Sequence, residues 1–215
     1  MLMFARKLQS IFFLLVFSVF AGGSLSAAEE LRAAEVAAAL KRSSEWQLAN
    51  PTGTDITDWV IAPLYDGLLR AAITTGERGL MEAVARFGQQ AGWSPRWRPY
   101  HADDHAVGHA WLDIYLLDPT RKERLAPVKE ALDFVLAHPI TEELDFRKQP
   151  QSPGVAKTDR WTWCDALYMA PPTLARLHTA TGDARYLEFL DAEFRECLMS
   201  QVAERAIDLN FDLRL

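Results

Sequence analysis

The sequence predicts an all-α protein made of repeated antiparallel helix pairs. Apolar residues recur at helical spacing along most of the chain, and turn signals near Gly76, Pro119 and Gly182 interrupt them. These turns lie 43 and 63 residues apart, which indicates hairpins joined by loops of unequal length. No comparable run of alternating β-branched residues predicts a strand. Repeated hairpins build either a helical solenoid or a closed α/α toroid, and periodicity alone does not separate the two.

A leading helix and a first hairpin are expected between residues 29 and 91. Residues 29–49 are rich in Ala and Leu, and the turn-forming sequence Asn50-Pro51-Thr52-Gly53 ends this helix. The first hairpin joins residues 55–74 to residues 78–91. Gly76 is the expected C-cap between them, because glycine accepts the left-handed conformation that ends many helices.

Two further hairpins follow the same plan. One joins residues 105–117 to residues 125–138, and its helices are separated by the breaker sequence Asp118-Pro119-Thr120. The other joins residues 162–179 to residues 187–198 after a long irregular connection. The chain therefore contains about three hairpins.

The composition is that of one soluble globular domain behind an export signal. A basic pair, Arg6-Lys7, precedes the apolar run of residues 11–21, and Ser26-Ala27-Ala28 offers small residues for cleavage. We therefore expect a signal peptide at residues 1–28 and one helical domain at residues 29–215. The apolar run of about 11 residues is short for a membrane span, which needs about 20, and an uncleaved anchor is the alternative. The predicted location is periplasmic or secreted, without membrane contact after cleavage.

The charge balance argues against nucleic acid as a partner. The chain has 215 residues and a formal net charge of −6. Removal of residues 1–28, which contain two basic and no acidic residues, leaves a net charge of −8. An acidic domain of this kind lacks the basic surface that binds phosphate backbones.

Neither the cysteines nor the histidines predict a metal or cofactor site. Cys164 and Cys197 have no zinc-like spacing with histidines, and Cys164 is expected to be a small packing residue, with a single disulfide as the alternative. His101, His105 and His109 share a helical face, but no third kind of ligand or known metal motif accompanies them. We expect no metal and no cofactor.

The segment from Trp161 to Pro172 places one acidic residue inside an aromatic and aliphatic run. If it is helical, Asp165 shares a face with Trp161 and Tyr168. Low-polarity neighbours would favour the protonated carboxyl group and raise its pKa, as a general acid near neutral pH requires. The alternative is a structural Asp that caps a helix or pairs with an Arg.

A second acidic cluster, Asp103-Asp104, leads directly into the helix at residues 105–117. One of the two carboxylates is expected to be the helix N-cap, because a carboxylate accepts the free N–H groups of the first turn. The other can point to a pocket, where the helix terminus would keep it ionised. The two acidic segments then supply paired carboxylates from neighbouring helices, which suits acid and base catalysis.

These segments resemble a known family of enzymes. Trp163-Cys164-Asp165 with Tyr168-Met169-Ala170, and the run from Asp103 to Gly108 followed by Trp-Leu-Asp-Ile-Tyr, are similar to motifs of glycoside hydrolase families 88 and 105, the unsaturated glucuronyl and rhamnogalacturonyl hydrolases. The resemblance implies an (α/α)6 toroid, in which inner helices line a pocket. Six hairpins close such a ring, so the expected fold is an incomplete toroid of about three hairpins.

The resemblance also implies a reaction. Its substrate is an oligosaccharide that ends in a 4,5-unsaturated uronic acid, from pectin, rhamnogalacturonan or glycosaminoglycan breakdown. Asp165 would donate a proton to the enol ether and then accept one from the attacking water, and the resulting hemiketal would open and release the aglycone. Asp103, which fits the family's spacing to Gly108 better than Asp104, would position the sugar or the water.

Six further residues are candidates for substrate binding. The substrate carries a carboxylate, which calls for a basic or strongly donating group, and aromatic rings can stack on a sugar. The loops ahead of the two acids also contain Arg96 and Arg98. Each basic residue has a solvated alternative, and each Trp has a core alternative. The six candidates are Trp161, Trp163, Lys157, Arg160, Asp104 and Tyr168.

The resemblance extends over residues 59–190 and fades towards the C-terminus, where residues 206–215 match no part of the family pattern. We therefore expect the two acids to be present while the opposite pocket wall is missing, in a truncated chain whose activity is open. Half a toroid would also leave apolar helix flanks uncovered. The alternative function is a noncatalytic helical-repeat module that binds carbohydrate or protein, and the sequence leaves the oligomeric state open.

Overall fold

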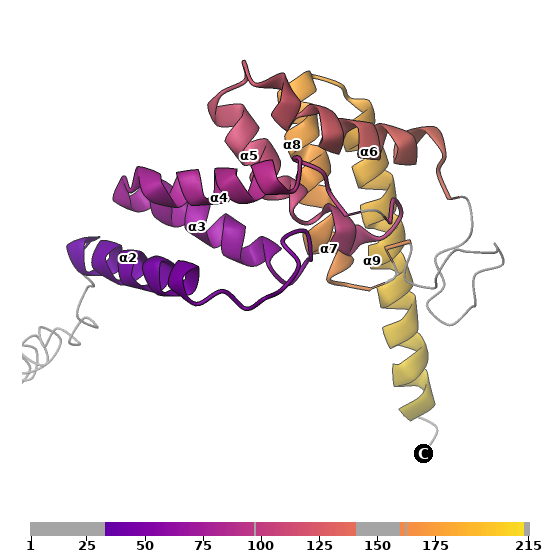
Figure 1. Cartoon of the computed structure of the whole chain (residues 1–215). Helices are drawn as coiled ribbons and strands as arrows, with labels where there is room; N and C mark the ends of the chain where they lie inside the picture. The colour runs from indigo at the N-terminus through magenta and orange to yellow at the C-terminus, as the bar shows by residue number, and fades with distance from the viewer. Residues whose placement is uncertain (1–32, 97, 141–159, 162, 213–215) are drawn as a thin grey trace, which may run out of the picture. The chain divides into compact units, whose positions relative to one another are not determined.

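The computed structural model describes residues 33–96, 98–140, 160–161 and 163–212, and within these residues it contains helices and no strands (Figure 1). The all-α prediction is confirmed for this part of the chain, and the expected signal peptide at residues 1–28 lies outside it. The elements are α2 (Ala33–Ala49), α3 (Ala62–Thr75), α4 (Arg78–Gln90), the 3-10 helix η1 (Ala102–His105), α5 (Gly108–Leu117), the 3-10 helix η2 (Lys122–Arg124), α6 (Ala126–Ala137), α7 (Ala166–Met169), α8 (Pro171–Thr181) and α9 (Arg185–Asp212).

The chain divides into two units, Met1–Ala39 and Leu40–Leu215. Of the first unit, the structure describes only residues 33–39, which begin α2. The second unit holds all of the hairpins. The description below concerns the second unit. Within the described residues, no helix is both long and apolar enough to cross a membrane.

Three antiparallel hairpins, α3/α4, α5/α6 and α8/α9, make up the second unit, as the turn spacing predicted. Their first helices lie side by side in the order α3, α5, α8, while α6 also contacts α9 (Figure 1). Each hairpin therefore contributes one helix to a common row and one helix that backs it. This arrangement fits part of an α/α toroid, whose inner helices form such a row.

Glycines end the first helix of two hairpins. Gly76 has φ 75° and Gly182 has φ 74°, and their N–H groups donate to the carbonyl oxygens of Ala72 and His178. A side chain in this left-handed conformation is strained, so glycine is the favoured residue at both C-caps. The C-cap prediction for Gly76 is confirmed.

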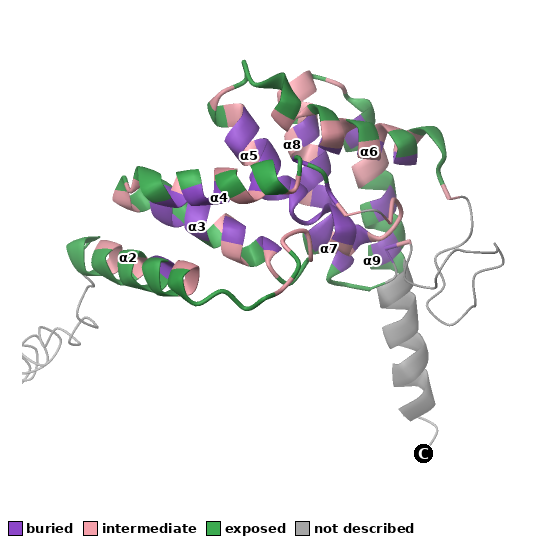
Figure 2. Cartoon of the chain, viewed as in Figure 1, coloured by how far each residue is buried: buried purple, intermediate pink, exposed green. Residues whose placement is uncertain are grey.

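Helix α5 is the centre of the core because it contacts α3, α4, α6 and α8. Its residues Trp111 and Leu112 are fully buried. Figure 2 shows buried positions along α5. The Trp111 ring lies 5.3 Å from the Tyr65 ring of α3 and meets the Trp93 ring edge to face at 5.9 Å. Aromatic pairs of this geometry add about 0.5–1.5 kcal/mol each beyond the burial of their area. The core thus fixes α5, the helix that follows Asp103.

The expected continuous helix over residues 162–179 is wrong. Residues 163–165 form a bend and a turn, α7 is only four residues long, and α8 begins at Pro171. Pro171 and Pro172 lack N–H groups, and a proline disfavours the helical conformation of the residue before it. The prolines therefore start a new helix at the point where the sequence pattern suggested continuity.

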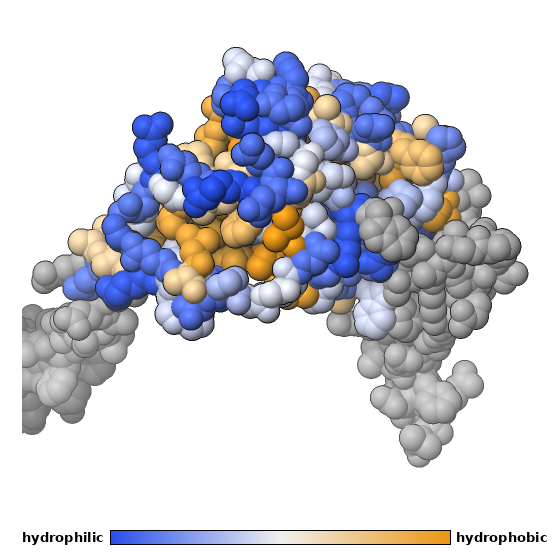
Figure 3. Space-filling model, in the orientation of Figure 1, coloured by the Kyte–Doolittle hydropathy of each residue, from blue (hydrophilic) through white to orange (hydrophobic). Residues whose placement is uncertain are grey.

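Some apolar side chains in the row of first helices are exposed to solvent. Ile73 in α3 is 62% exposed and Leu117 in α5 is 56% exposed. Figure 3 shows apolar side chains gathered over α3, flanked by hydrophilic ones. A hollow of about 200 Å³ lies between α3, Met81 of α4 and the end of α5.

Candidate active site

Asp165 stands at the N-terminus of α7 as its N-cap residue. Its backbone carbonyl oxygen accepts hydrogen bonds from the Tyr168 and Met169 N–H groups at 2.8 and 3.2 Å. The Asp165 side chain is exposed, so the expected apolar surroundings are wrong. The expectation assumed a continuous helix that would place indole rings around the carboxyl group. The turn at residues 163–165 instead brings the side chain to the surface.

Asp103 lies in η1 and is partly buried, with its Oδ2 atom 3.6 Å from His101 Nδ1. Burial raises the pKa of the Asp103 carboxyl group, and the negative charge of Asp165 raises it further, against an opposing effect of His101. Since η1 packs against α7, the structure brings the two predicted acids into one electrostatic environment. A helix terminus that favours the ionised carboxylate would lower the pKa of Asp103, but in this structure the pKa is raised, so the expected direction of the shift is wrong.

The Asp104 carboxylate forms an ion pair with the Arg98 guanidinium. The Asp104 side chain is 1% exposed, and its oxygens accept hydrogen bonds from the Arg98 backbone N–H at 2.8 Å and from the guanidinium Nη2 at 2.5 Å. A buried carboxylate with these partners is stabilised by them and is placed to fix the loop over residues 98–104. This geometry favours a structural role over the predicted contact with substrate.

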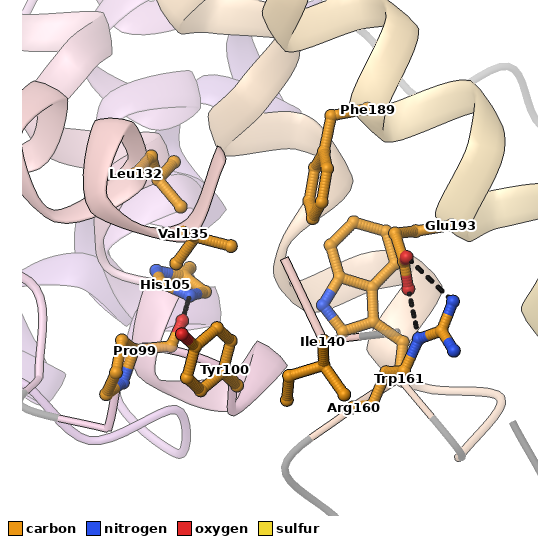
Figure 4. Close-up of a pocket in the computed structure, with 10 residues that line it drawn as sticks. All are labelled: Pro99, Tyr100, His105, Leu132, Val135, Ile140, Arg160, Trp161, Phe189 and Glu193. Atoms are coloured by element: carbon orange, nitrogen blue, oxygen red, sulfur yellow. Dashed lines mark hydrogen bonds and ion pairs between the residues drawn. The ribbon is translucent and has the colours of Figure 1, made fainter. Parts of the chain in front are cut away.

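The segment that leads to Asp165 packs along α9 (Figure 4). Arg160 donates to both Glu193 carboxylate oxygens at 2.9 and 3.0 Å, and the Trp161 ring meets Phe189 edge to face at 6.1 Å. Trp161 is only 5% exposed. The core alternative is therefore correct for Trp161, and the Arg160 guanidinium already binds a carboxylate of the protein.

Two aromatic candidates remain on the surface near Asp165. Trp163 is 51% exposed and Tyr168 is 45% exposed, so both rings are accessible to a sugar. The Tyr168 hydroxyl donates to Asp66 Oδ2 at 3.2 Å, and burial together with the Asp66 charge raises the pKa of Tyr168. The candidate Lys157 lies outside the described residues.

Sequence reasoning missed the polar group beneath Tyr168. His109 of α5 is 1% exposed, its Nδ1 atom lies 3.1 Å from Asp66 Oδ2, and its Nε2 atom lies 2.8 Å from the Met169 carbonyl oxygen. These contacts connect α3 and α5 to α7, the helix that Asp165 begins. The signal in the sequence was a histidine inside an apolar helix, which the sequence analysis considered only as a metal ligand and then set aside.

A second polar layer lies one helical turn further along α5. Asp113 of α5 accepts hydrogen bonds from Arg176 of α8 at 2.7 and 3.1 Å and from Arg70 of α3 at 3.0 Å. Charged groups from all three helices of the row therefore meet at one carboxylate. Such an arrangement fixes the rotation of each helix relative to the next, because the ion pairs require specific side-chain directions.

The three histidines have separate surroundings. His105 is fully buried, and burial lowers its pKa to about 4, so the ring is neutral and Nε2–H donates to the Pro99 carbonyl oxygen at 2.7 Å. His109 instead contacts Asp66, as described above, and His101 lies beside Asp103. Among the described residues, no group of three or more His, Cys, Asp or Glu side chains is arranged to hold a metal.

A small hollow beside His105 is unsuited to a sugar. It has a volume of about 20 Å³, which is close to the space of a single water, and lies among residues of α6, α9 and the segments before η1 and α7 (Figure 4). Ligand pockets typically measure about 300–1,000 Å³. The candidate site is therefore the surface around Asp103, Asp165, Trp163 and Tyr168.

Comparison with known proteins gives a family and a fold. The family model described as Glycosyl Hydrolase Family 88 matches residues 32–203. An unsaturated 3S-rhamnoglycuronyl hydrolase of Formosa agariphila is 30% identical over 189 residues, which are 85% of this chain and 49% of that protein. An enzyme of the same name from Alteromonas sp. is 33% identical over 143 residues, 63% of this chain and 34% of the relative.

A solved structure of a polysaccharide lyase superposes with a TM-score of 0.60 at 19% sequence identity, over 78% of this chain and 46% of the lyase. At this identity the likeness concerns the fold alone. The chain spans about half the length of the curated relative that it matches over the greater part of its sequence.

Proposed function

The chain belongs to glycosyl hydrolase family 88, and on that premise we propose that it acts on oligosaccharides that end in an unsaturated uronic acid. Two relatives are named for unsaturated rhamnoglycuronyl substrates, so a uronyl group linked to rhamnose is the substrate class that we propose first. Export to the periplasm or the exterior, by way of residues 1–28, accompanies this proposal because such substrates derive from extracellular polysaccharides.

The reaction we propose is hydration of the enol ether. A carboxyl group donates a proton to C4 of the double bond, and water adds at C5 and loses its proton to a carboxylate. The hemiketal formed at C5 then opens, and the aglycone leaves as an alcohol. No covalent sugar–enzyme bond is needed, in contrast to retaining glycosidases, which require a carboxylate nucleophile.

The observation that carries this proposal is the pairing of Asp103 with Asp165. The two carboxyl groups begin neighbouring helical segments, and the charge of one raises the pKa of the other. Paired acids with displaced pKa values are the usual arrangement for proton transfer in both directions. The family resemblance gives Asp165 the role of proton donor, and burial raises the pKa of the Asp103 carboxyl group beside it.

The test is turnover of an unsaturated uronyl-rhamnose disaccharide, followed as loss of the double-bond absorbance. We expect Asp165→Asn and Asp103→Asn each to lower kcat by about 10²-fold or more, the usual contribution of a positioned acid or base. Asp191→Asn is the matched control, because Asp191 lies on the exposed surface of α9 with Arg195. Unchanged turnover in Asp165→Asn and Asp103→Asn would refute the acid and base roles.

The same experiment decides the alternative function. If the unmodified chain binds the disaccharide without turnover, and Asp165→Asn binds it equally well, the chain is a noncatalytic carbohydrate-binding module. The exposure of Asp165 is the observation that favours this alternative. Binding would be measured by calorimetry at substrate concentrations well above the expected Kd.

A further inference from the structure

Arg160, Trp161 and Trp163 contact one face of α9 over about two helical turns. Phe189 contacts the Trp161 ring, Glu193 binds the Arg160 guanidinium, and the Cys197 sulfur lies 3.7 Å from the Trp163 carbonyl oxygen. These three residues of α9 are spaced by four, so they occupy one stripe of the helix. Three separate contacts therefore hold these residues against α9.

The third contact brings two cysteines together. Cys197 is 1% exposed and Cys164 is exposed, and both are free thiols in this structure. Cys164 directly follows the carbonyl group that Cys197 approaches, so its Cα atom lies within about 7 Å of the Cys197 sulfur. The expectation that Cys164 is a buried packing residue is wrong, and the cysteine inside the core is Cys197.

We propose that Cys164 and Cys197 form a reversible disulfide that ties the segment carrying Asp165 to α9. Disulfides join residues whose Cα atoms are about 4.4–6.8 Å apart. The contact of the Cys197 sulfur with the carbonyl group directly before Cys164 brings the two thiols near enough for a small shift of the turn at residues 163–165 to join them. The bond would close at the residue next to a proposed catalytic acid. The formation of the bond does not depend on the proposed function.

The chemistry is thiol–disulfide exchange with a low-molecular-weight disulfide. The exposed Cys164 thiolate attacks the donor disulfide, forms a mixed disulfide and releases one thiol. Cys197 then loses its proton and attacks the Cys164 sulfur, which releases the second thiol. Two protein thiols are oxidised, one donor disulfide is reduced, and the two protons pass to the released thiols.

The environment of each cysteine sets the order of these steps. Burial raises the pKa of Cys197 to about 11, and the nearby Cys164 contributes in the same direction. Cys197 is therefore a poor first nucleophile and serves as the resolving thiol, while Cys164 meets the donor in solvent. At pH values below the Cys197 pKa, the resolving step should accelerate about tenfold for each unit by which the pH is raised, since the thiolate fraction rises by that factor.

The experiment treats the full chain with oxidised glutathione under native conditions, followed by an acid quench and intact-mass analysis. We expect the chain to lose about 2 Da, the mass of two hydrogens, and a non-reducing digest to link the peptides that contain Cys164 and Cys197. Closure of this loop should raise the Tm by about 5–10 °C, and a reductant should reverse the rise.

Single variants provide the controls. Cys197→Ser should stop at a glutathione mixed disulfide on Cys164, and Cys164→Ser should remain unreacted while folded, with far-UV circular dichroism as the check on folding. In the unmodified chain, the disulfide between Cys164 and Cys197 should form more slowly in urea than in the native state, because unfolding separates the two residues. A native chain that carries only mixed or chain-to-chain disulfides, or that links no faster than the unfolded chain, would overturn the proposal.

Discussion

Substitution of Gly108 by alanine should push apart α5 and α8, the helices that follow the segments carrying the two candidate acids. Gly108 begins α5, five residues after Asp103, and faces Thr173 of α8. An added Cβ atom would lie 2.6 Å from Thr173 Cγ2 and 3.0 Å from Thr173 Oγ1. Thr173 is fully buried, and its hydroxyl donates to the His105 carbonyl oxygen at 2.8 Å, so the side chain cannot turn away without losing that bond.

The size of the effect follows from this contact. The Cβ atom would be about 0.8 Å closer to Cγ2 than the shortest ordinary contact of 3.4 Å. Overpacking of a core typically costs about 1–3 kcal/mol, and the better helix propensity of alanine returns up to about 1 kcal/mol. We expect a net loss of about 1–2 kcal/mol in the free energy of unfolding, which lowers the Tm by about 2–8 °C.

Urea denaturation followed by circular dichroism measures this loss, and Thr173→Ser tests its cause. Serine removes Cγ2 and keeps the hydroxyl that bonds to His105. In the unmodified chain, Thr173→Ser should lower the free energy of unfolding by about 1 kcal/mol for the lost methyl group. In the Gly108→Ala chain the same substitution should lower it by almost nothing further, because it also removes the Cγ2 atom that the new Cβ atom would meet. The expected coupling energy between the two sites is about 1 kcal/mol or more.

Two results would refute this reasoning. If Gly108→Ala is as stable as the unmodified chain, the α5–α8 contact is looser than the structure indicates. If the two substitutions are additive, the cost arises elsewhere than at the Cγ2 contact. A parallel fall in activity, restored in the double variant, would further connect the helix spacing to the pairing of Asp103 with Asp165.

Three further predictions concern charge and packing. Burial holds the folded-state pKa of Asp103 above its unfolded value of 3.8, so the protonated group stabilises the fold at low pH, and this stability is lost as the pH rises through the folded-state pKa. Asp103→Asn should remove this pH-dependent loss of stability, as measured by melting curves across pH 3 to about 8. Arg98→Met should cost about 3–5 kcal/mol in urea denaturation, because Asp104 stays buried without its cation, and a cost below 1 kcal/mol would show that water replaces the guanidinium. Leu177→Ala should cost about 2–5 kcal/mol, since Leu177 is fully buried, whereas the exposed Leu187→Ala should change stability by less than about 0.5 kcal/mol.

The candidate site was only partly predictable. Asp103 and Asp165 were chosen from their motifs, and the structure brings them into one environment. Asp165 was predicted in apolar surroundings and is exposed, whereas Asp103 was predicted at an ionising helix terminus and is partly buried. Burial depends on how the turn before α7 meets the rest of the chain. Asp66 was missed altogether, since its partners His109 and Tyr168 are 43 and 102 residues away in sequence.

The sequence by itself determined the pairing of the helices into hairpins and most of the helices, apart from the break between α7 and α8. Apolar spacing, the glycine C-caps and the breaker at Pro119 act between neighbouring residues, so they can be read without knowledge of the fold. The motifs likewise identified the family through residues that stand close together in the chain.

The tertiary structure alone decided which side chains the solvent reaches. Trp161 and Trp163 are two residues apart in the same motif, yet one lies in the core against α9 and the other is half exposed. The two cysteines also differ in exposure, because Cys197 is buried and Cys164 is exposed. Burial is set by the elements that pack against a residue, and here that element is a helix about 30 residues further along the chain.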